Sequence, residues 1–221
     1  PWVISFSLFK ILVKNDISIE TINPQANPDY QHKLPGSRPG VYLISYADGP
    51  EVFFQNQNTL AASALNKGID FILNYRRSHI SKEFLAQNNF ILSQKTGAGF
   101  WLWKPYFILK TLESIPENAL LLYADTGFVL KKALSPLLNL LKNKEMILFE
   151  YPRTVSPSPG TITSRDTFTK MNCDLPQCRH GAHLMAGLLL LKNTSQTRNF
   201  IRKWLSHCKQ KELIIGPSNN T

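Results

Sequence analysis

Ala119-Leu120-Leu121-Leu122-Tyr123-Ala124-Asp125-Thr126-Gly127 is the stretch of this sequence that decides the fold. Residues 119–123 are apolar without interruption, which is typical of a strand buried on both faces of a parallel sheet. Such a strand places Asp125 at the mouth of the sheet, where a carboxylate can bind a divalent cation or accept a hydrogen bond from a ribose hydroxyl. Gly127 lets a ligand approach the backbone. An ordinary Asp-Xaa-Gly turn explains these residues equally well.

Strand-like and helical patterns alternate on both sides of this stretch. The sequence predicts strands at 41–46, 69–75, 119–123, 146–151 and 184–191, and helices at 52–67, 81–94, 100–115, 135–142, 165–172 and 198–208. The strand at 146–151 is expected to be buried, like the one at 119–123. This alternation is typical of an α/β protein whose mostly parallel, Rossmann-like central sheet is flanked by helices. Ligands of such sheets bind where strands deliver loops at their carboxyl ends.

The length of 221 residues suits one compact domain. Four prolines and few apolar positions between residues 16 and 40 predict an irregular lead-in over 1–40, with a single domain at 41–221. The chain begins with Pro1 instead of Met, which favours a fragment or a processed product. The apolar segment 1–13 is shorter than the roughly 20 residues that span a bilayer. It is expected to be a packed helix or strand or the remainder of a signal anchor.

Composition places the chain among globular proteins. Hydrophobic residues make up 43% and charged residues 18%, which argues against a disordered or fibrous protein. The net charge of +10 favours an anionic partner such as a phosphate ester, a nucleic acid or a membrane surface. The basic residues are scattered along the chain, so a solvated basic surface explains the charge as well.

Three cysteines are present, and an odd number in a long chain predicts reduced thiols without a disulfide framework. We therefore expect a cytoplasmic protein, with a membrane-anchored form of the secretory pathway as the alternative. Cys173 and Cys178 precede His180 and His183, but their spacing matches no common zinc template. His183 stands just before the strand at 184–191, where it is either a general base or metal ligand or simply a loop residue.

An aromatic segment at 100–115 follows the glycine-rich joint at 96–99. Helical spacing relates four of its residues, Trp101, Pro105, Ile108 and Leu112. This spacing predicts that their side of the helix packs in the core. Trp103 and Lys104 lie on other sides. We hypothesise that Lys104 neutralises a ligand phosphate as a point charge and that a Trp face stacks on a sugar or a base.

These motifs resemble those of a known family. Residues 123–127, Tyr-Ala-Asp-Thr-Gly, are similar to the strand-end motif of GT-A glycosyltransferases, especially bacterial polysaccharide-type enzymes related to families 8 and 32. Residues 97–106, Gly-Ala-Gly-Phe-Trp-Leu-Trp-Lys-Pro-Tyr, resemble a Gly-Xaa-Gly-Tyr-Trp-Xaa-Trp-Lys-Pro signature that precedes the Asp motif in such proteins. Residues 185–193 and 199–204 resemble the strand that lines the acceptor side and the helix that follows it. The resemblance covers roughly residues 41–210, and the Trp-Xaa-Trp-Lys-Pro element is its most specific part.

The resemblance implies a GT-A-like fold and a transferase of the hexosyltransferase type, active in polysaccharide biosynthesis. Such an enzyme moves a sugar from a nucleotide-diphosphate-sugar donor to a carbohydrate or another hydroxyl acceptor. Asp125 would be its catalytic residue and would bind Mn²⁺ or Mg²⁺. The implied donor-site residues are Ser45, Tyr46, Asp48, Trp103, Lys104, Tyr123, Thr126 and Gly127. On the acceptor side we expect His183, Ala186 and Gly187.

Two departures from the family pattern are visible. Gly127 stands where the second carboxylate of an Asp-Xaa-Asp motif is expected, although one carboxylate can still hold Mg²⁺ together with the donor diphosphate. The chain also ends before the His-Asp-Gln element that such enzymes commonly supply, which predicts a domain truncated at its carboxyl terminus. Two alternatives stay open. One is an inactive relative that binds nucleotide sugars, and the less favoured one is a basic nucleic-acid-binding module, for which no recognisable motif is present.

Overall fold

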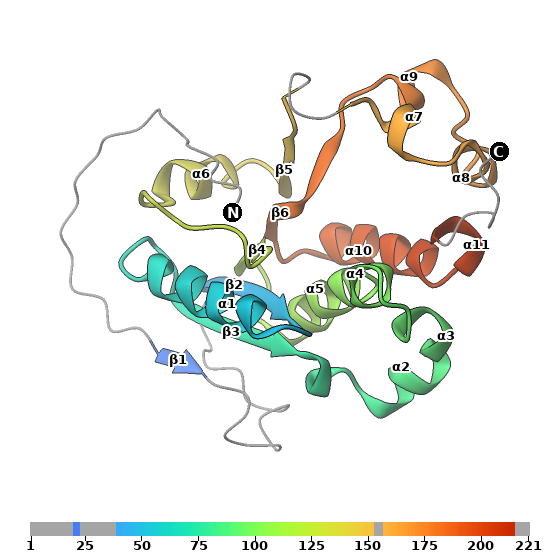
Figure 1. Cartoon of the computed structure of the whole chain (residues 1–221). Helices are drawn as coiled ribbons and strands as arrows, with labels where there is room; N and C mark the ends of the chain where they lie inside the picture. Colours follow the sequence, from blue (N-terminus) through green and yellow to red (C-terminus); the bar gives the residue numbers. More distant parts are fainter. Residues whose placement is uncertain (1–19, 23–38, 153–156, 215–221) are drawn as a thin grey trace.

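The computed structural model describes residues 20–22, 39–152 and 157–214 of the chain. Its centre is a sheet whose strands follow the order β1-β3-β2-β4-β6-β5 (Figure 1). The strands are β1 (Glu20–Ile22), β2 (Val41–Ala47), β3 (Phe71–Arg76), β4 (Leu120–Ala124), β5 (Met146–Glu150) and β6 (Leu184–Lys192). The four strands β1, β3, β2 and β4 pair in parallel. The predicted mostly parallel α/β fold is confirmed, and β6 runs antiparallel to both of its neighbours, β4 and β5.

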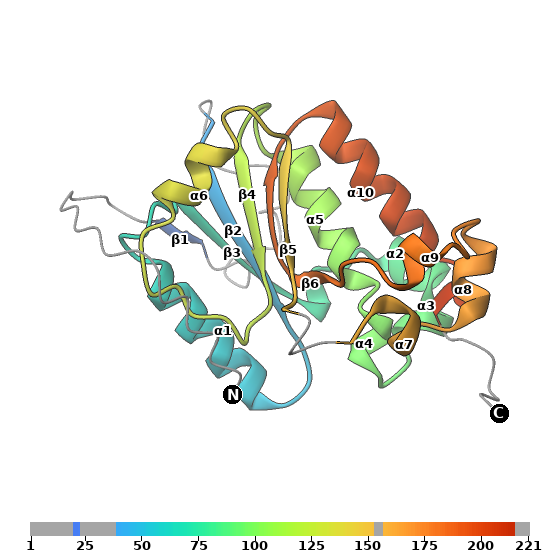
Figure 2. The same ribbon diagram turned by 90° about the horizontal axis from the view of Figure 1, so that it is seen from above.

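Helices cover both faces of this sheet (Figure 2). On one face lie α1 (Glu51–Ala64) and α6 (Ser135–Leu140), and on the other α5 (Trp103–Ser114) and α10 (Ser195–Cys208). Successive strand residues point to opposite faces, so Tyr123 and Leu121 of β4 join the core under α5, while Leu122 joins the core under α1. The apolar runs of the sequence are therefore buried on both sides, as a sheet in the middle of three layers requires.

Short helices complete the fold around the end of the sheet where β6 begins (Figure 2). They are the 3₁₀ helix η3 (Arg77–His79) and the helices α2 (Lys82–Gln87), α3 (Asn89–Leu92), α4 (Gly97–Phe100), α7 (Pro159–Ile162), α8 (Arg165–Lys170), α9 (Pro176–Arg179) and α11 (Lys211–Ile214). None of the helices in the described ranges is long and apolar enough to cross a membrane.

Four local predictions need correction. The helix expected at 81–94 is broken into α2 and α3 at Asn88, whose φ of −119° is not helical. The strand at 146–151 is half-buried, because β5 lies at the edge of the sheet. Trp101 is 51% exposed, so its predicted place in the core is wrong. The segment 1–40 is not irregular throughout, since β1 lies within it, and the rest of 1–38 is outside the described residues.

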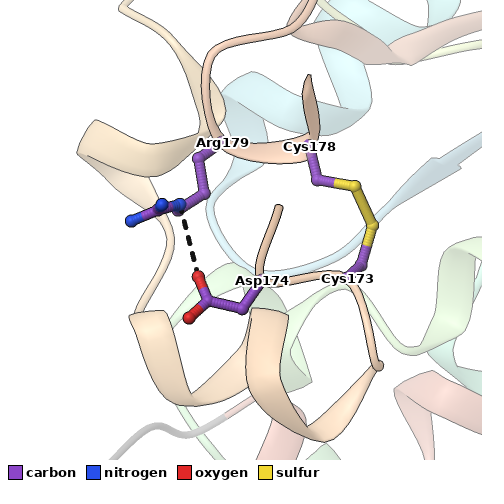
Figure 3. Close-up of a disulfide and its surroundings, with 4 residues drawn as sticks. All are labelled: Cys173, Asp174, Cys178 and Arg179. Carbon is purple, nitrogen blue, oxygen red and sulfur yellow. Dashed lines mark ion pairs between the residues drawn. A yellow bond between two sulfur atoms is a disulfide. The ribbon is translucent and has the colours of Figure 1, made fainter. Parts of the chain in front are cut away.

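The expectation of three reduced thiols is also wrong. Cys173 and Cys178 form a disulfide, and their Cα atoms are 6.1 Å apart (Figure 3). Asp174 pairs with Arg179 at 3.3 Å beside this disulfide and with Arg165 at 2.9 Å. The turn into α9 brings the two cysteines together, which their sequence spacing could not reveal. Disulfides are typical of oxidising compartments, so the prediction of a cytoplasmic protein loses the observation that favoured it.

Candidate functional site

The candidate site lies where the parallel strands end. Asp48 follows β2, Arg77 follows β3, and Asp125 follows β4. Because β6 runs antiparallel to β4, its first half reaches the same edge and brings Gly187 to Asp125. The sheet topology thus assembles charged groups from the ends of three parallel strands, as the carboxyl ends of parallel strands should, and β6 adds Gly187 beside them.

Asp125 is anchored through its backbone and free to meet solvent through its side chain. Its N–H donates to the carbonyl of Gly187 at 2.8 Å, while 40% of its side chain is exposed. A Cβ on Gly187 would lie 2.8 Å from Asp125 Oδ2, closer than real Cβ contacts occur. Gly187 was expected on the acceptor side, and the structure gives it a further role, because a Cβ there would require a shift of the carboxylate from its place beside Lys104.

Lys104 supplies the cation that balances Asp125. It lies in the first turn of α5, and only 5% of its side chain is exposed. Lys104 Nζ lies 3.1 Å from Asp125 Oδ1, and it donates to Asp125 Oδ2 at 3.2 Å and to the carbonyl of Ala186 at 3.0 Å. A buried ammonium is costly without such acceptors, so the pair and the carbonyl stabilise one another's positions.

Tyr123 completes the setting of the carboxylate. It is fully buried at the end of β4, and its hydroxyl donates to Asp125 Oδ1. Burial raises the pKa of Tyr123 well above the ordinary value, and the neighbouring charge of Asp125 and the hydrogen bond to it raise the pKa further. Tyr123 therefore remains a neutral phenol that donates to Asp125 across the physiological pH range.

Trp103 is almost fully buried beside the site. Its ring stacks on Tyr46 at 4.1 Å between centroids, its Nε1–H donates to the carbonyl of Gly97 at 2.9 Å, and it is 7% exposed. Tyr46 covers one face of Trp103, and the hypothesis that a Trp face stacks on a sugar or a base stays a prediction. Tyr46 in turn donates to Asp48 at 3.2 Å, and burial followed by the charge of Asp48 raises its pKa.

The segment of α4 and Trp101 is a left-handed turn, which precedes Trp103 and fixes its position. Five consecutive residues have positive φ, with values of 57°, 50°, 100°, 49° and 58° at Gly97, Ala98, Gly99, Phe100 and Trp101. Each non-glycine residue in this region carries strain of roughly 1–2 kcal/mol, and such strain gathers at functional sites. The turn points Trp101 outward, although helical spacing predicted it in the core. The Gly-Xaa-Gly pattern was the signal for this turn.

The remaining predicted donor-site residues lie along the same edge. Ser45 is 2% exposed, and its hydroxyl donates to Asn74 Oδ1 at 3.3 Å. This hydrogen bond joins the ends of β2 and β3 beneath the surface. Thr126 is half-buried and Gly127 is exposed, directly after Asp125. A Cβ on Gly127 would meet nothing within 4 Å, so steric crowding does not require glycine there.

His183 and Ala186 lie on the β6 side of the site. His183 packs against Tyr151 with ring centroids 5.0 Å apart, and its carbonyl accepts from the N–H of Tyr151, which ties this loop to the end of β5. Ala186 is exposed and borders a cavity of about 580 Å³ between β6 and α10. The lining of this cavity is mainly apolar and includes Met185, Leu189, Phe200, Trp204 and Cys208.

Two basic residues of the site were missed from the sequence. Arg77 forms an ion pair with Asp48 at 3.7 Å, and the guanidinium of Arg76 lies over the ring of Phe54 at 4.8 Å. The signal was a pair of arginines at the end of a predicted strand.

The side chains at this edge do not form a site for a resident divalent cation. The described part of the chain holds no group of three or more His, Cys, Asp or Glu side chains that could bind a metal ion. Both carboxylate oxygens of Asp125 face the ammonium of Lys104, at 3.1 and 3.2 Å. A dication at Asp125 would be repelled by this ammonium at close range. The donor set therefore does not fit the predicted Mn²⁺ or Mg²⁺.

Comparisons with known proteins leave the family open. No protein-family model matches the chain, and no curated protein sequence does. Among solved structures, the chain is similar to the galactosyltransferase LgtC in complex with donor and acceptor sugar analogues, with a TM-score of 0.43 and 17% sequence identity. The match covers 79% of this chain and 65% of the galactosyltransferase, so the chain spans less than two thirds of that protein. At this level of similarity, function has to be inferred from the site itself.

Proposed function

We propose that this protein is a glycosyltransferase that moves a sugar from a nucleotide-diphosphate-sugar donor to a hydroxyl acceptor. One observation carries the proposal. A buried lysine and a partly exposed aspartate, Lys104 and Asp125, are paired at the carboxyl edge of a mostly parallel sheet. This edge is where such sheets bind nucleotides, and the pair belongs to the two motifs that resemble those of GT-A glycosyltransferases.

The charges at this edge suit the leaving group of the reaction. Sugar transfer releases a nucleoside diphosphate, whose negative charge grows as the glycosidic bond breaks. A cationic group fixed in advance at that position stabilises the transition state. Lys104 is such a group, and Arg77 adds a second cation at the end of β3. The net charge of +10 supports an anionic ligand in general.

Asp125 has a different task in this proposal. Its partly exposed carboxylate accepts hydrogen bonds from hydroxyl groups of the donor, while Tyr123 and Lys104 hold it in one orientation. Orientation of this kind brings the anomeric carbon toward the acceptor and lowers the entropic cost of the reaction. We place the acceptor hydroxyl beside Ala186, which is exposed next to this pair and borders the cavity between β6 and α10.

A binding screen tests the proposal. UDP- and GDP-sugars are titrated by calorimetry and thermal shift into the wild type and into Asp125→Asn, which keeps the shape of the side chain. A donor that binds the folded state raises the melting temperature by mass action. We expect one nucleotide class to bind and its affinity to fall at least tenfold in Asp125→Asn. Absence of binding by every donor would contradict the proposal.

Turnover separates the enzyme from its alternatives. Release of the free nucleoside diphosphate in the presence of sugar acceptors is expected of a transferase. Donor binding without release would identify an inactive relative that binds nucleotide sugars. Steeply salt-dependent binding of RNA or DNA, in place of donor binding, would identify the nucleic-acid-binding module.

A further inference from the structure

We propose that the donor site works without a divalent cation and that the ammonium of Lys104 is its built-in cation. This inference rests on the function proposed above and names the cofactor requirement of the same site. It differs from the sequence-based prediction of Mn²⁺ or Mg²⁺ at Asp125.

The first support is that both oxygens of the Asp125 carboxylate already contact a cation. Asp125 Oδ1 accepts from the hydroxyl of Tyr123 and lies 3.1 Å from Lys104 Nζ, and Oδ2 accepts from Lys104 at 3.2 Å. Binding of a dication would break this pair and leave the ammonium buried beside a second positive charge. The carboxylate of Asp125 thus holds the ammonium of Lys104 in place.

The second support is the fixed positive charge of Lys104. An ammonium has three N–H donors. The described residues accept hydrogen bonds from two of them, through Asp125 Oδ2 and the carbonyl of Ala186. Asp125 Oδ1 lies 3.1 Å from the same Nζ, so Lys104 acts on the donor diphosphate as a fixed point charge.

The third support is that the same arrangement recurs at the neighbouring strand. Asp48, which follows β2, pairs with Arg77, which follows β3, at 3.7 Å. Each carboxylate that directly follows β2 or β4 therefore has a basic side chain as its partner. Gly127, in the position of a second metal ligand, has no side chain to offer.

The test is a calorimetric titration of UDP and GDP in excess EDTA and in excess Mn²⁺. We expect the wild type to bind one nucleotide with an affinity that differs less than twofold between the two conditions. Lys104→Met keeps the apolar stem and removes the charge. We expect it to lose at least tenfold in affinity in EDTA and to regain part of it with Mn²⁺, because the freed carboxylate can then accept a metal ion.

The double variant Lys104→Met/Asp125→Asn leaves no unpaired charge. It provides a second test if the single variant does not fold. It should bind weakly in both conditions, without rescue by Mn²⁺. A wild type that loses tenfold or more in EDTA would overturn this inference and leave the proposed function standing. A wild type that binds no nucleotide in either condition would overturn the proposed function and the inference with it.

Discussion

At the scale of single residues, the position of Asp125 depends on the absence of a side chain at residue 187. In Gly187→Ala the added methyl would lie 2.8 Å from Asp125 Oδ2, so we expect the carboxylate to shift from its position beside Lys104. We expect at least a tenfold loss of nucleotide affinity in calorimetry, with a loss of about 1–3 kcal/mol in unfolding free energy from overpacking.

Gly160→Ala is the matched control for this prediction. Its added methyl would lie 3.0 Å from the carbonyl oxygen of Arg179 and would contact neither Asp125 nor Lys104. It should lower stability while leaving nucleotide affinity within twofold of the wild type. Unchanged affinity in Gly187→Ala would show that the orientation of Asp125 is unimportant for binding.

His79 is the residue from which we expect a pH dependence of stability. Its Nδ1 accepts from the N–H of Arg76 at 2.9 Å, so the imidazole is neutral in the fold. Burial lowers the pKa of His79, and the charges of Lys110 and Arg76 lower the pKa further. The stabilisation is therefore present above the unfolded-state pKa of about 6.5 and is lost as pH falls below it.

The measurement is the melting temperature between pH 7.5 and about pH 5, a window set by the ordinary pKa of histidine. His79→Gln can still accept the hydrogen bond from Arg76 and should lose less stability on acidification than the wild type. The exposed His180 provides the control, and His180→Gln should follow the wild-type curve. Equal pH dependence in His79→Gln and the wild type would show that His79 does not titrate as argued.

At the scale of elements, the left-handed turn at 97–101 places Trp103 and thereby α5. Gly97 has a φ of 57°, and a Cβ there would lie 2.5 Å from the ring of Trp101. Gly97→Ala therefore combines a backbone penalty of about 1 kcal/mol with a steric clash, and we expect a total loss above 2 kcal/mol in denaturant unfolding.

Gly49→Ala separates the two contributions. Gly49 has a φ of 82°, but a Cβ there would meet nothing within 4 Å, so only the backbone penalty of about 1 kcal/mol should remain. Replacing Trp101 by Ala in the Gly97→Ala background should recover the steric part of the loss. Equal losses in Gly97→Ala and Gly49→Ala would contradict the close approach of Trp101.

At the scale of the whole molecule, the disulfide closes a short loop in the segment between β5 and β6. A loop of this size contributes about 2 kcal/mol in the chain-entropy model. Without reductant, we expect one reactive thiol per chain in denaturant, from Cys208, and three after reduction. In the folded protein this thiol should react slowly, because burial raises the pKa of Cys208 to about 11. Three reactive thiols without reductant would contradict the disulfide.

Much of the fold was predictable because it depends on local patterns. Mainly apolar runs identified β2, β3, β4 and β6, and turn residues marked where strands end. The position of Asp125 at the end of β4 followed from the same pattern. Helix α5 was predicted from its spacing, although its start was placed too early, since the left-handed turn at 97–101 leaves Trp101 outside the helix.

The sequence by itself determined the order of the elements, the α/β class and the carboxylate at the strand end, because periodicity and apolar runs act over a few residues. Only the tertiary structure decided that β6 enters antiparallel beside β4, since a buried strand has the same apolar pattern in either direction. That pairing brings Gly187 beneath Asp125 and the carbonyl of Ala186 to Lys104. The pair of Lys104 and Asp125, 21 residues apart, and the disulfide arise from contacts between elements, which no local pattern encodes.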